Sequence, residues 1–140
     1  MAQQIKGGFD VKRSMEPACD MGDGAEAGHF RFDKRFHGDL DATSVVHMLA
    51  VTTAVEGSAA YVAIERLTGT LQGRSGTFFM QHNGTMHRGV PTLALSVVPD
   101  SGTDALEGLA GDMTIDIVDG KHFYTLRFEF SEARADKHQP

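Results

Sequence analysis

Glu65, His82 and Tyr61 are the residues whose types and spacing point most directly to chemistry. They lie between Gly57 and Gly89, in the stretch GSAAYVAIERLTGTLQGRSGTFFMQHNGTMHRG, which is typical of two strands joined by a turn. A carboxylate can hold an imidazole in one tautomer, and a phenol can donate a hydrogen bond to a developing oxyanion. This combination predicts general acid–base chemistry. The competing interpretation is a buried polar pair whose members only satisfy each other's hydrogen bonds.

The turn at Gln72-Gly73 decides which of these residues share a face. Glycine tolerates the positive φ that a two-residue hairpin loop requires. With that loop, Glu65 and His82 become diagonal neighbours across the two strands, about 7–8 Å apart at Cα. The shared face then carries Tyr61, Ala63, Glu65, Leu67, Phe78, Met80 and His82. A three-residue loop would instead place Gln81 on the face of Glu65.

A third histidine and a second tyrosine complete the candidate site. His47 lies on a strand with little other polarity, so it faces either a dry interior, where it would act as a base, or a dimer interface. Tyr124 lies on the core-facing side of the last strand, where its hydroxyl meets either a ligand or the rim of the fold. The predicted catalytic residues are His47, Glu65 and His82, and the predicted pocket residues are Tyr61, Met80, Tyr124 and Phe128.

Metal, cofactor and nucleophile motifs are not found. The chain contains no HxH pair, no HExxH and no Cys/His cluster, so no metal and no cofactor are predicted. Cys19 is the single cysteine and lies in a loop-like segment beside Pro17. Its acidic neighbours Glu16 and Asp20 do not favour a reactive thiolate, which predicts a plain free thiol.

The bulk composition excludes several classes of partner. With 140 residues, the chain is predicted to form one domain over residues 1–140, with a frayed polar tail over 130–140. Its formal charge of −6 and lack of a Lys/Arg cluster argue against nucleic acid and anionic membranes as partners. No apolar run is long enough to span a bilayer. The absence of a signal-like start and of cysteine pairs predicts a cytoplasmic protein.

Short alternating segments between spaced glycines predict eight antiparallel strands and no convincing helix. The expected strands are Gly8–Arg13, His29–His37, Ser44–Ala54, Ala59–Leu71, Arg74–Asn83, Thr92–Pro99, Asp112–Val118 and His122–Phe130. The middle strands are apolar on both faces and therefore need a second cover. We expect a homodimer through their outer faces, with a loop or the N-terminal segment as the alternative cover.

An eight-stranded closed barrel is the predicted fold, because closure removes the exposed edges of a sheet. Eight strands enclose a space that either side chains or one small ligand can fill. A two-sheet β-sandwich is the alternative, since alternation does not distinguish the two architectures.

Three longer motifs resemble a bacterial family of small proteins of unknown function. They are GSAAYVAIERLTGTLQGRSGTFFMQHNGTM, VVPDSGTDALEGLAGDMTIDI and DGKHFYTLRFEF, within a resemblance that runs from about Phe9 to Phe130. That family is similar to the allene oxide cyclase-like barrels, which implies an eight-stranded antiparallel barrel that forms dimers. Where the family pattern has a small residue and then Glu or Gln, this chain has Val46 and His47, so an activity that depends on an acid there would not carry over.

The sequence therefore predicts a cofactor-independent lyase, isomerase or cyclase. Its substrate would be a small hydrophobic molecule in the barrel lumen, with a histidine or Glu65 as the group that moves the proton. One alternative is a lipocalin-like carrier that binds an apolar ligand without chemistry. The other is a filled barrel with only a structural role.

Overall fold

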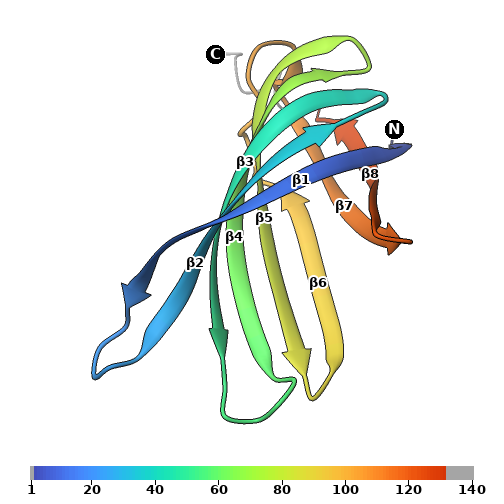
Figure 1. Cartoon of the computed structure of the whole chain (residues 1–140). Coiled ribbons are helices and arrows are strands. Elements are labelled where there is room, and N and C mark those ends of the chain that lie inside the picture. Colours follow the sequence, from blue (N-terminus) through green and yellow to red (C-terminus); the bar gives the residue numbers. More distant parts are fainter. Residues whose placement is uncertain (1, 132–140) are drawn as a thin grey trace.

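The computed structural model describes residues 2–131 and shows eight β-strands with one short turn of 3-10 helix (Figure 1). The strand bounds are β1 Gln3–Asp20, β2 Glu26–Phe36, β3 Leu40–Thr52, β4 Ala59–Leu71, β5 Arg74–His87, β6 Val90–Val97, β7 Leu109–Val118 and β8 Lys121–Phe130. The helical turn η1 covers Asp104–Leu106. The predicted eight-strand all-β architecture is confirmed, and part of the predicted tail, residues 132–140, lies outside the described residues.

The strands form a closed antiparallel barrel in sequence order. Each strand pairs with the next, and β1 closes the ring by pairing with β8 from Gln3↔Phe128 to Phe9↔His122. Closure confirms the barrel and excludes the two-sheet sandwich. The outcome agrees with the physical expectation that a small all-β domain hides its strand edges by pairing the first strand with the last.

The β4–β5 hairpin has the predicted register. Gln72 and Gly73 form the two-residue loop with φ of 50° and 83°, as a type I′ turn requires. Leu71 consequently pairs with Arg74, and the ladder continues through Glu65↔Met80 to Ala63↔His82 and beyond. The inner face of this hairpin is therefore the one that the sequence predicted.

One end of the barrel is filled by side chains. The residues fully buried at this end are large and apolar, and aromatic rings of Phe36 and Tyr124 meet edge to face with centroids 5.5 Å apart. The core includes Phe36, Leu40, Leu67, Leu71, Phe78, Met80, Leu106, Leu109, Leu126 and Phe128. This packed end, at the top of Figure 1, gives the fold its stability and leaves the other end free to hold a site.

The other end of the barrel is open because the strands diverge there (Figure 1). β6 and β7 pair only through Leu95↔Met113 and Ser96↔Asp112. Beyond these pairs, β3 to β6 continue downward as a sheet, while the β1–β2 hairpin extends to one side and the β7–β8 hairpin to the other. The inner face of the extended sheet is therefore exposed next to the barrel interior.

The segment between β6 and β7 replaces a strand beside the upper half of β5. The backbone N–H of Thr103 donates to the Thr77 carbonyl at 2.9 Å, and that of Val98 donates to the Phe79 carbonyl at 2.8 Å. Gly76 permits this close approach, since a Cβ there would lie 2.2 Å from the Thr103 carbonyl oxygen. The loop thus satisfies backbone groups of β5 that β6 does not reach.

β1 is longer than its predicted span, and this corrects the placement of Cys19. The strand continues past Arg13 to Asp20, where Cys19 pairs with Ala27 of β2 rather than lying in a loop. A register shift between Glu16 and Cys19 accommodates Pro17, in agreement with the confinement of proline to bulges and edges. In residues 2–131, no helix is long and apolar enough to cross a membrane.

Candidate functional site

Glu65 is the centre of a buried polar cluster inside the barrel. Its side chain is completely buried, on the inner face of β4. Ser44 of β3 donates its hydroxyl hydrogen to Oε2 at 2.6 Å, and His82 of β5 lies with Nε2 2.7 Å from Oε1. Lys34 of β2 places Nζ 3.4 Å from the same Oε1. Four adjacent strands therefore contribute one polar side chain each to a single point.

The charge of Glu65 follows from the balance between burial and these partners. Burial alone would raise the pKa of this carboxyl group. The hydrogen bond and the electrostatic interaction with His82, the positive charge of Lys34, and the Ser44 hydroxyl together outweigh burial and lower the pKa of Glu65. Glu65 is thus a carboxylate that is stabilised in an apolar interior by a cation and two hydrogen-bond donors.

The geometry around Glu65 assigns the roles of the two nitrogens of His82. A carboxylate only accepts hydrogen bonds, so the proton on Nε2 must be the one that His82 donates to Glu65. In the neutral ring, Nδ1 then carries a lone pair. Nδ1 makes no hydrogen bond with any other described residue. The arrangement is a carboxylate–imidazole dyad with its basic nitrogen available.

Lys34 is a buried cation among aromatic rings. Its side chain is only 7% exposed, and Nζ lies 5.0 Å from the centroid of the Phe9 ring and 5.7 Å from that of Phe36. Ring faces and the Glu65 carboxylate together offset the desolvation of the ammonium group. The 3.4 Å separation from Glu65 leaves this cation able to attract a second negative charge.

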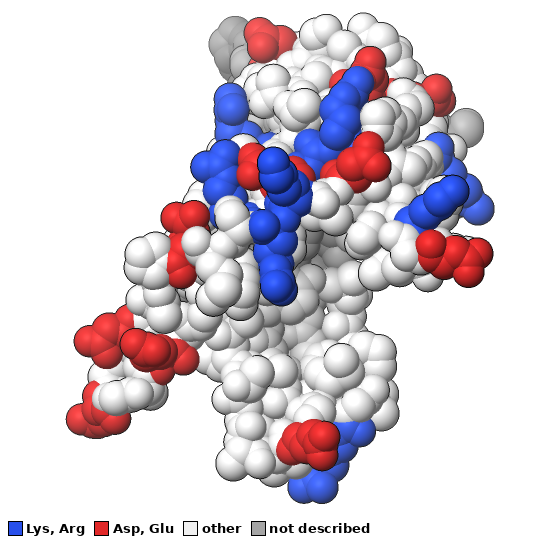
Figure 2. Space-filling view, in the orientation of Figure 1, with Lys and Arg blue, Asp and Glu red and all other residues white. Residues whose placement is uncertain are grey.

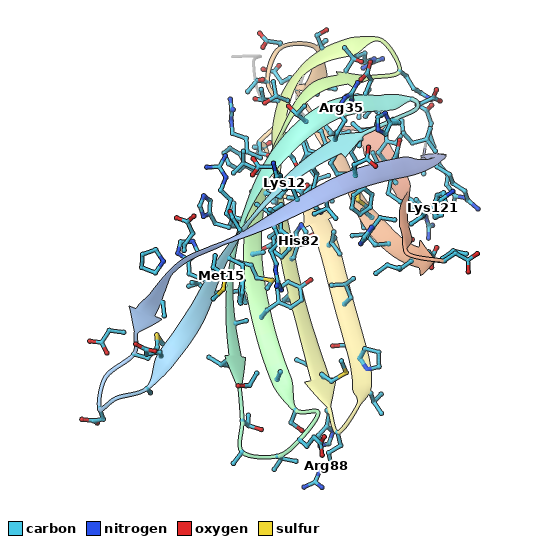
Figure 3. The ribbon with its side chains drawn as sticks, in the orientation of Figure 1. Lys12, Met15, Arg35, His82, Arg88 and Lys121 are labelled. Carbon is cyan, nitrogen blue, oxygen red and sulfur yellow. The ribbon has the colours of Figure 1, made fainter. Side chains whose placement is uncertain are left out.

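A cavity of about 180 Å³ adjoins the cluster on the open side of the barrel. Lys34, His82, Tyr61 and His122 supply its polar groups. The apolar part of the wall consists of Phe9, Val11, Phe32, Val46, Met48, Ala63 and Ile115. Figure 3 shows His82 near the level at which β1 crosses in front of the other strands, and Figure 2 shows a hollow at that level. A small, mostly apolar molecule fits such a cavity beside the dyad.

Tyr61 forms part of the wall of this cavity. Its ring lies against Gly84 on the neighbouring strand, where a Cβ would come within 2.5 Å of a ring carbon. Burial raises the pKa of the Tyr61 phenol, and the negative charge of Glu65 raises it further. Tyr61 is therefore a protonated hydroxyl, and it makes no hydrogen bond with another described side chain. It can donate to an oxygen atom of a bound molecule.

Three of the predicted pocket residues lie outside the cavity wall. Met80 is fully buried in the core beneath the cluster, and Phe128 packs edge to face against Phe130 at the filled end. The Tyr124 hydroxyl donates to the His37 carbonyl at 2.9 Å and accepts from the backbone N–H of Leu40 at 3.4 Å. Tyr124 thus binds the β2–β3 turn to the core.

His47 faces outward, on the opposite side of the barrel wall from Glu65. Its neighbour Val46 is the residue that points inward, and His47 pairs across the strands with exposed Ile64. His47 Nδ1 lies 2.9 Å from Nε2 of His29, also on the outer face. The structure therefore brings Glu65, His82 and Tyr61 together and separates His47 from them.

Comparison with known proteins agrees with this architecture. The family model described as "Protein of unknown function (DUF3224)" matches residues 5–128. The chain belongs to the DUF3224 family. A crystal structure of a DUF3224 protein of unknown function from Shewanella oneidensis MR-1 is 45% identical over 94% of this chain and 99% of that chain, with a TM-score of 0.87. No curated protein matches the chain.

Membership of the DUF3224 family confirms the predicted resemblance to a bacterial family of unknown function. Membership of this family does not identify a reaction or a ligand. The similarity to allene oxide cyclase-like barrels is not addressed by these comparisons and stays a prediction. The cluster around Glu65 is therefore the feature of this chain that indicates a function.

Lys34 and Ser44 are the site residues that the sequence analysis missed. The signal for Lys34 was present in strand alternation, because Phe30, Phe32 and Phe36 have the inner parity and Lys34 stands between them. A lysine in an otherwise aromatic inner face requires a buried anion. Ser44 pairs with Lys34 across the strands and shares that face. Among residues 2–131, no group of three or more His, Cys, Asp or Glu side chains is placed to hold a metal ion.

Proposed function

We propose that the protein is a proton-transfer enzyme, a lyase or isomerase of a small hydrophobic substrate that binds in the barrel cavity. The observation that carries the proposal is the His82–Glu65 dyad in the wall of a mostly apolar cavity, where Nδ1 of His82 has no partner among the described residues. Lys34 and Tyr61 lie at the same cavity, so a base and two groups that stabilise negative charge converge on one volume.

In the proposed mechanism, His82 is the general base. Its Nδ1 takes a proton from a carbon that is made acidic by a neighbouring carbonyl or similar group. Glu65 stabilises the imidazolium that forms, because its carboxylate already accepts the Nε2 proton at 2.7 Å. The electron pair left on the substrate moves to its oxygen, where the Lys34 ammonium and the Tyr61 hydroxyl stabilise the charge. Return of the proton to another carbon gives isomerisation, and loss of a leaving group gives elimination.

The hydrophobic character of the substrate follows from the wall of the cavity and from its mouth. Below the closed part of the barrel, the inner faces of β5 and β6 expose Met86 and Leu93. In Figure 2 the lower part of the molecule carries acidic and basic side chains only near the ends of its hairpins. A charged or strongly polar molecule would lose its hydration in this cavity without matching partners.

A carrier that binds an apolar ligand without chemistry is the second candidate function, and the apolar wall favours it. A carrier, however, has no need of a buried carboxylate. Burying Glu65 and Lys34 costs free energy that an apolar pair of similar volume would not cost. Perturbed ionisable groups in a cavity are more typical of a reaction centre.

Elimination of 5-nitrobenzisoxazole tests the proposal without knowledge of the natural substrate. A base removes the proton from C3 of this probe, the N–O bond breaks, and the electrons end on a coloured phenolate. We expect the wild-type protein to accelerate this reaction by about 10²–10⁴-fold over buffer. His82→Gln should lose most of the acceleration, and Glu65→Gln should retain an intermediate rate.

The matched control is His87→Gln, since His87 is an exposed histidine on the same strand. It should keep the wild-type rate. Equal rates for the wild type and His82→Gln would refute His82 as the base. Saturable binding of the probe without any turnover would refute the enzyme and leave the carrier.

A further inference from the structure

Part of the outer face of the β3–β6 sheet carries no charged side chain, and no described residue covers it. Strand register arranges it in three rows that cross all four strands. The rows are His47–Ile64–Gln81–Ser96, Leu49–Val62–Asn83–Ala94 and Val51–Ala60–Thr85–Thr92. We call these twelve residues the outer surface. All are exposed except Ser96, which is half-buried, and none is charged.

The large apolar side chains of the outer surface are unusually open to solvent. Val62 is 57% exposed, Ile64 51% and Val51 42%. The solvent face of an antiparallel sheet is normally polar, because polar residues alternate along each strand with the apolar residues that face the core. This face instead combines aliphatic and neutral polar groups, which is typical of an interface rather than of a solvated wall.

We propose that the outer surface binds the same surface of a second copy of this chain. In a twofold dimer each surface meets itself, so a surface with a net charge would face the same net charge. The outer surface carries none, although the whole chain has a formal charge of −6. A contact that covers only neutral groups avoids the repulsion between two acidic copies.

The polar groups of the outer surface are also of the kind that can pair with themselves. The amides of Gln81 and Asn83 each contain donors and an acceptor, and neither makes a hydrogen bond with another described side chain. An amide on one copy can therefore bond to an amide on the other. A charged partner or a nucleic acid would find no complementary charge here.

The size of the surface is at the lower limit for a specific contact. Four strands about 4.8 Å apart and three rows about 7 Å apart give a footprint of roughly 400 Å². Two copies in contact would bury about 800 Å² through these rows alone, and specific interfaces begin at about 1,000 Å². A groove of about 510 Å³ extends the contact area toward the β1–β2 hairpin, because its wall includes Cys19 and His29 together with six residues of the outer surface.

Residues 132–140, EARADKHQP, contain no large apolar side chain, so their composition does not suit them to cover this surface. The surface is also separate from the proposed site, which opens on the inner face of the same strands. Failure of the dimer would therefore leave the lumen chemistry untouched.

Sedimentation velocity on the full chain between about 1 and 100 µM tests the dimer. The wild type should have twice the mass of the 15.1 kDa chain. Ile64→Lys should weaken association at least about 100-fold, because each copy would bury an unpaired ammonium group in the interface. Gln81→Lys, at the position paired with Ile64, gives a second disruption at a residue that makes no core contact.

The matched control is Val118→Lys, since Val118 is a 52% exposed valine on β7, outside the outer surface. It should remain dimeric, and circular dichroism should show all three variants folded. A monomeric wild type at every concentration would overturn the proposal. So would an unchanged dimer in both Ile64→Lys and Gln81→Lys, or a dimer that Val118→Lys disrupts equally. A monomeric wild type that binds bis-ANS, with binding lost in Ile64→Lys, would also overturn it in favour of a small apolar occupant.

Discussion

At the scale of single residues, Glu65 links the stability of the barrel to its proposed chemistry. The same carboxylate accepts hydrogen bonds from Ser44 and His82 and neutralises Lys34. A buried charge with three partners is costly to remove singly, because each partner then loses its own compensation. Glu65 therefore orients His82 and also holds β2, β3, β4 and β5 in register.

Glu65 should make the stability of the protein depend on pH in a defined direction. Its pKa in the folded state is below the usual 4.5, so the unfolded chain takes up the proton first as the pH falls. This contribution to stability is fully present above the unfolded pKa and is lost as the pH falls through the folded pKa. Glu65→Gln removes it. We expect the variant to be about 3 kcal/mol less stable at pH 7 and to lose less than the wild type on acidification.

Urea unfolding at pH 7 and at about pH 3.5 measures this difference. Glu56→Gln is the matched control, because Glu56 is exposed in the turn between β3 and β4. This variant should reproduce the wild-type dependence of stability on pH. If Glu65→Gln loses as much stability as the wild type between the two pH values, the carboxylate does not have the role assigned to it.

Part of this cluster was predictable from the sequence alone. A two-residue loop at Gln72-Gly73 was enough to place Glu65 diagonal to His82, because period-2 alternation carries that register along the hairpin. His47 was not predictable in the same way. Its strand is apolar on both faces, so alternation could not decide which parity points inward.

At the scale of elements, glycines allow backbone segments to approach where a side chain would not fit. Gly76 is the clearest case, since the Thr103 carbonyl occupies the place of its Cβ. This contact holds the segment between β6 and β7 against β5. No sequence pattern indicated it, because the contact joins residues far apart along the chain and depends on where the loop returns.

Gly76→Ala should destabilise the fold by about 2 kcal/mol, because a backbone atom must move to make room. The control is Gly8→Ala in β1, where the nearest atom is at an ordinary 3.6 Å and little change is expected. Thermal unfolding of the two variants measures the contrast. Equal melting temperatures for Gly76→Ala and the wild type would show that the loop does not pack as described.

At the scale of the whole molecule, the barrel closes between β6 and β7 through only a short ladder, Leu95↔Met113 and Ser96↔Asp112. Alternation predicted which face of each strand is buried but not whether the sheet closes. The sequence therefore left a β-sandwich as the alternative to the barrel. The predicted strand bounds also stopped short, most of all for β1, because Pro17 and nearby polar residues resemble a loop. Pairing with β2 keeps that segment extended.

The short pairing between β6 and β7 predicts a specific pattern of amide hydrogen exchange. Residues 90–94 of β6 pair with β5 on one side and with no described strand on the other. Pro91 has no amide hydrogen, so the test falls on Val90, Thr92, Leu93 and Ala94. An amide among these that points away from β5 should exchange fast and those bonded to β5 slowly, whereas the amides of β4, which pairs on both sides, should all be slow. Exchange followed by NMR measures this. Uniform protection along β6 would mean that another segment covers this edge.

We infer that Glu65 holds His82 with Nε2 protonated and leaves Nδ1 as a free base in the cavity. Long-range ¹⁵N–¹H NMR of the histidine rings distinguishes the two neutral tautomers directly. For His82 of the wild-type protein in its neutral form, we predict that the proton is on Nε2 and the lone pair on Nδ1. A ring with its proton on Nδ1 would contradict the account, since the lone pair would then face the Glu65 carboxylate and no base would face the cavity.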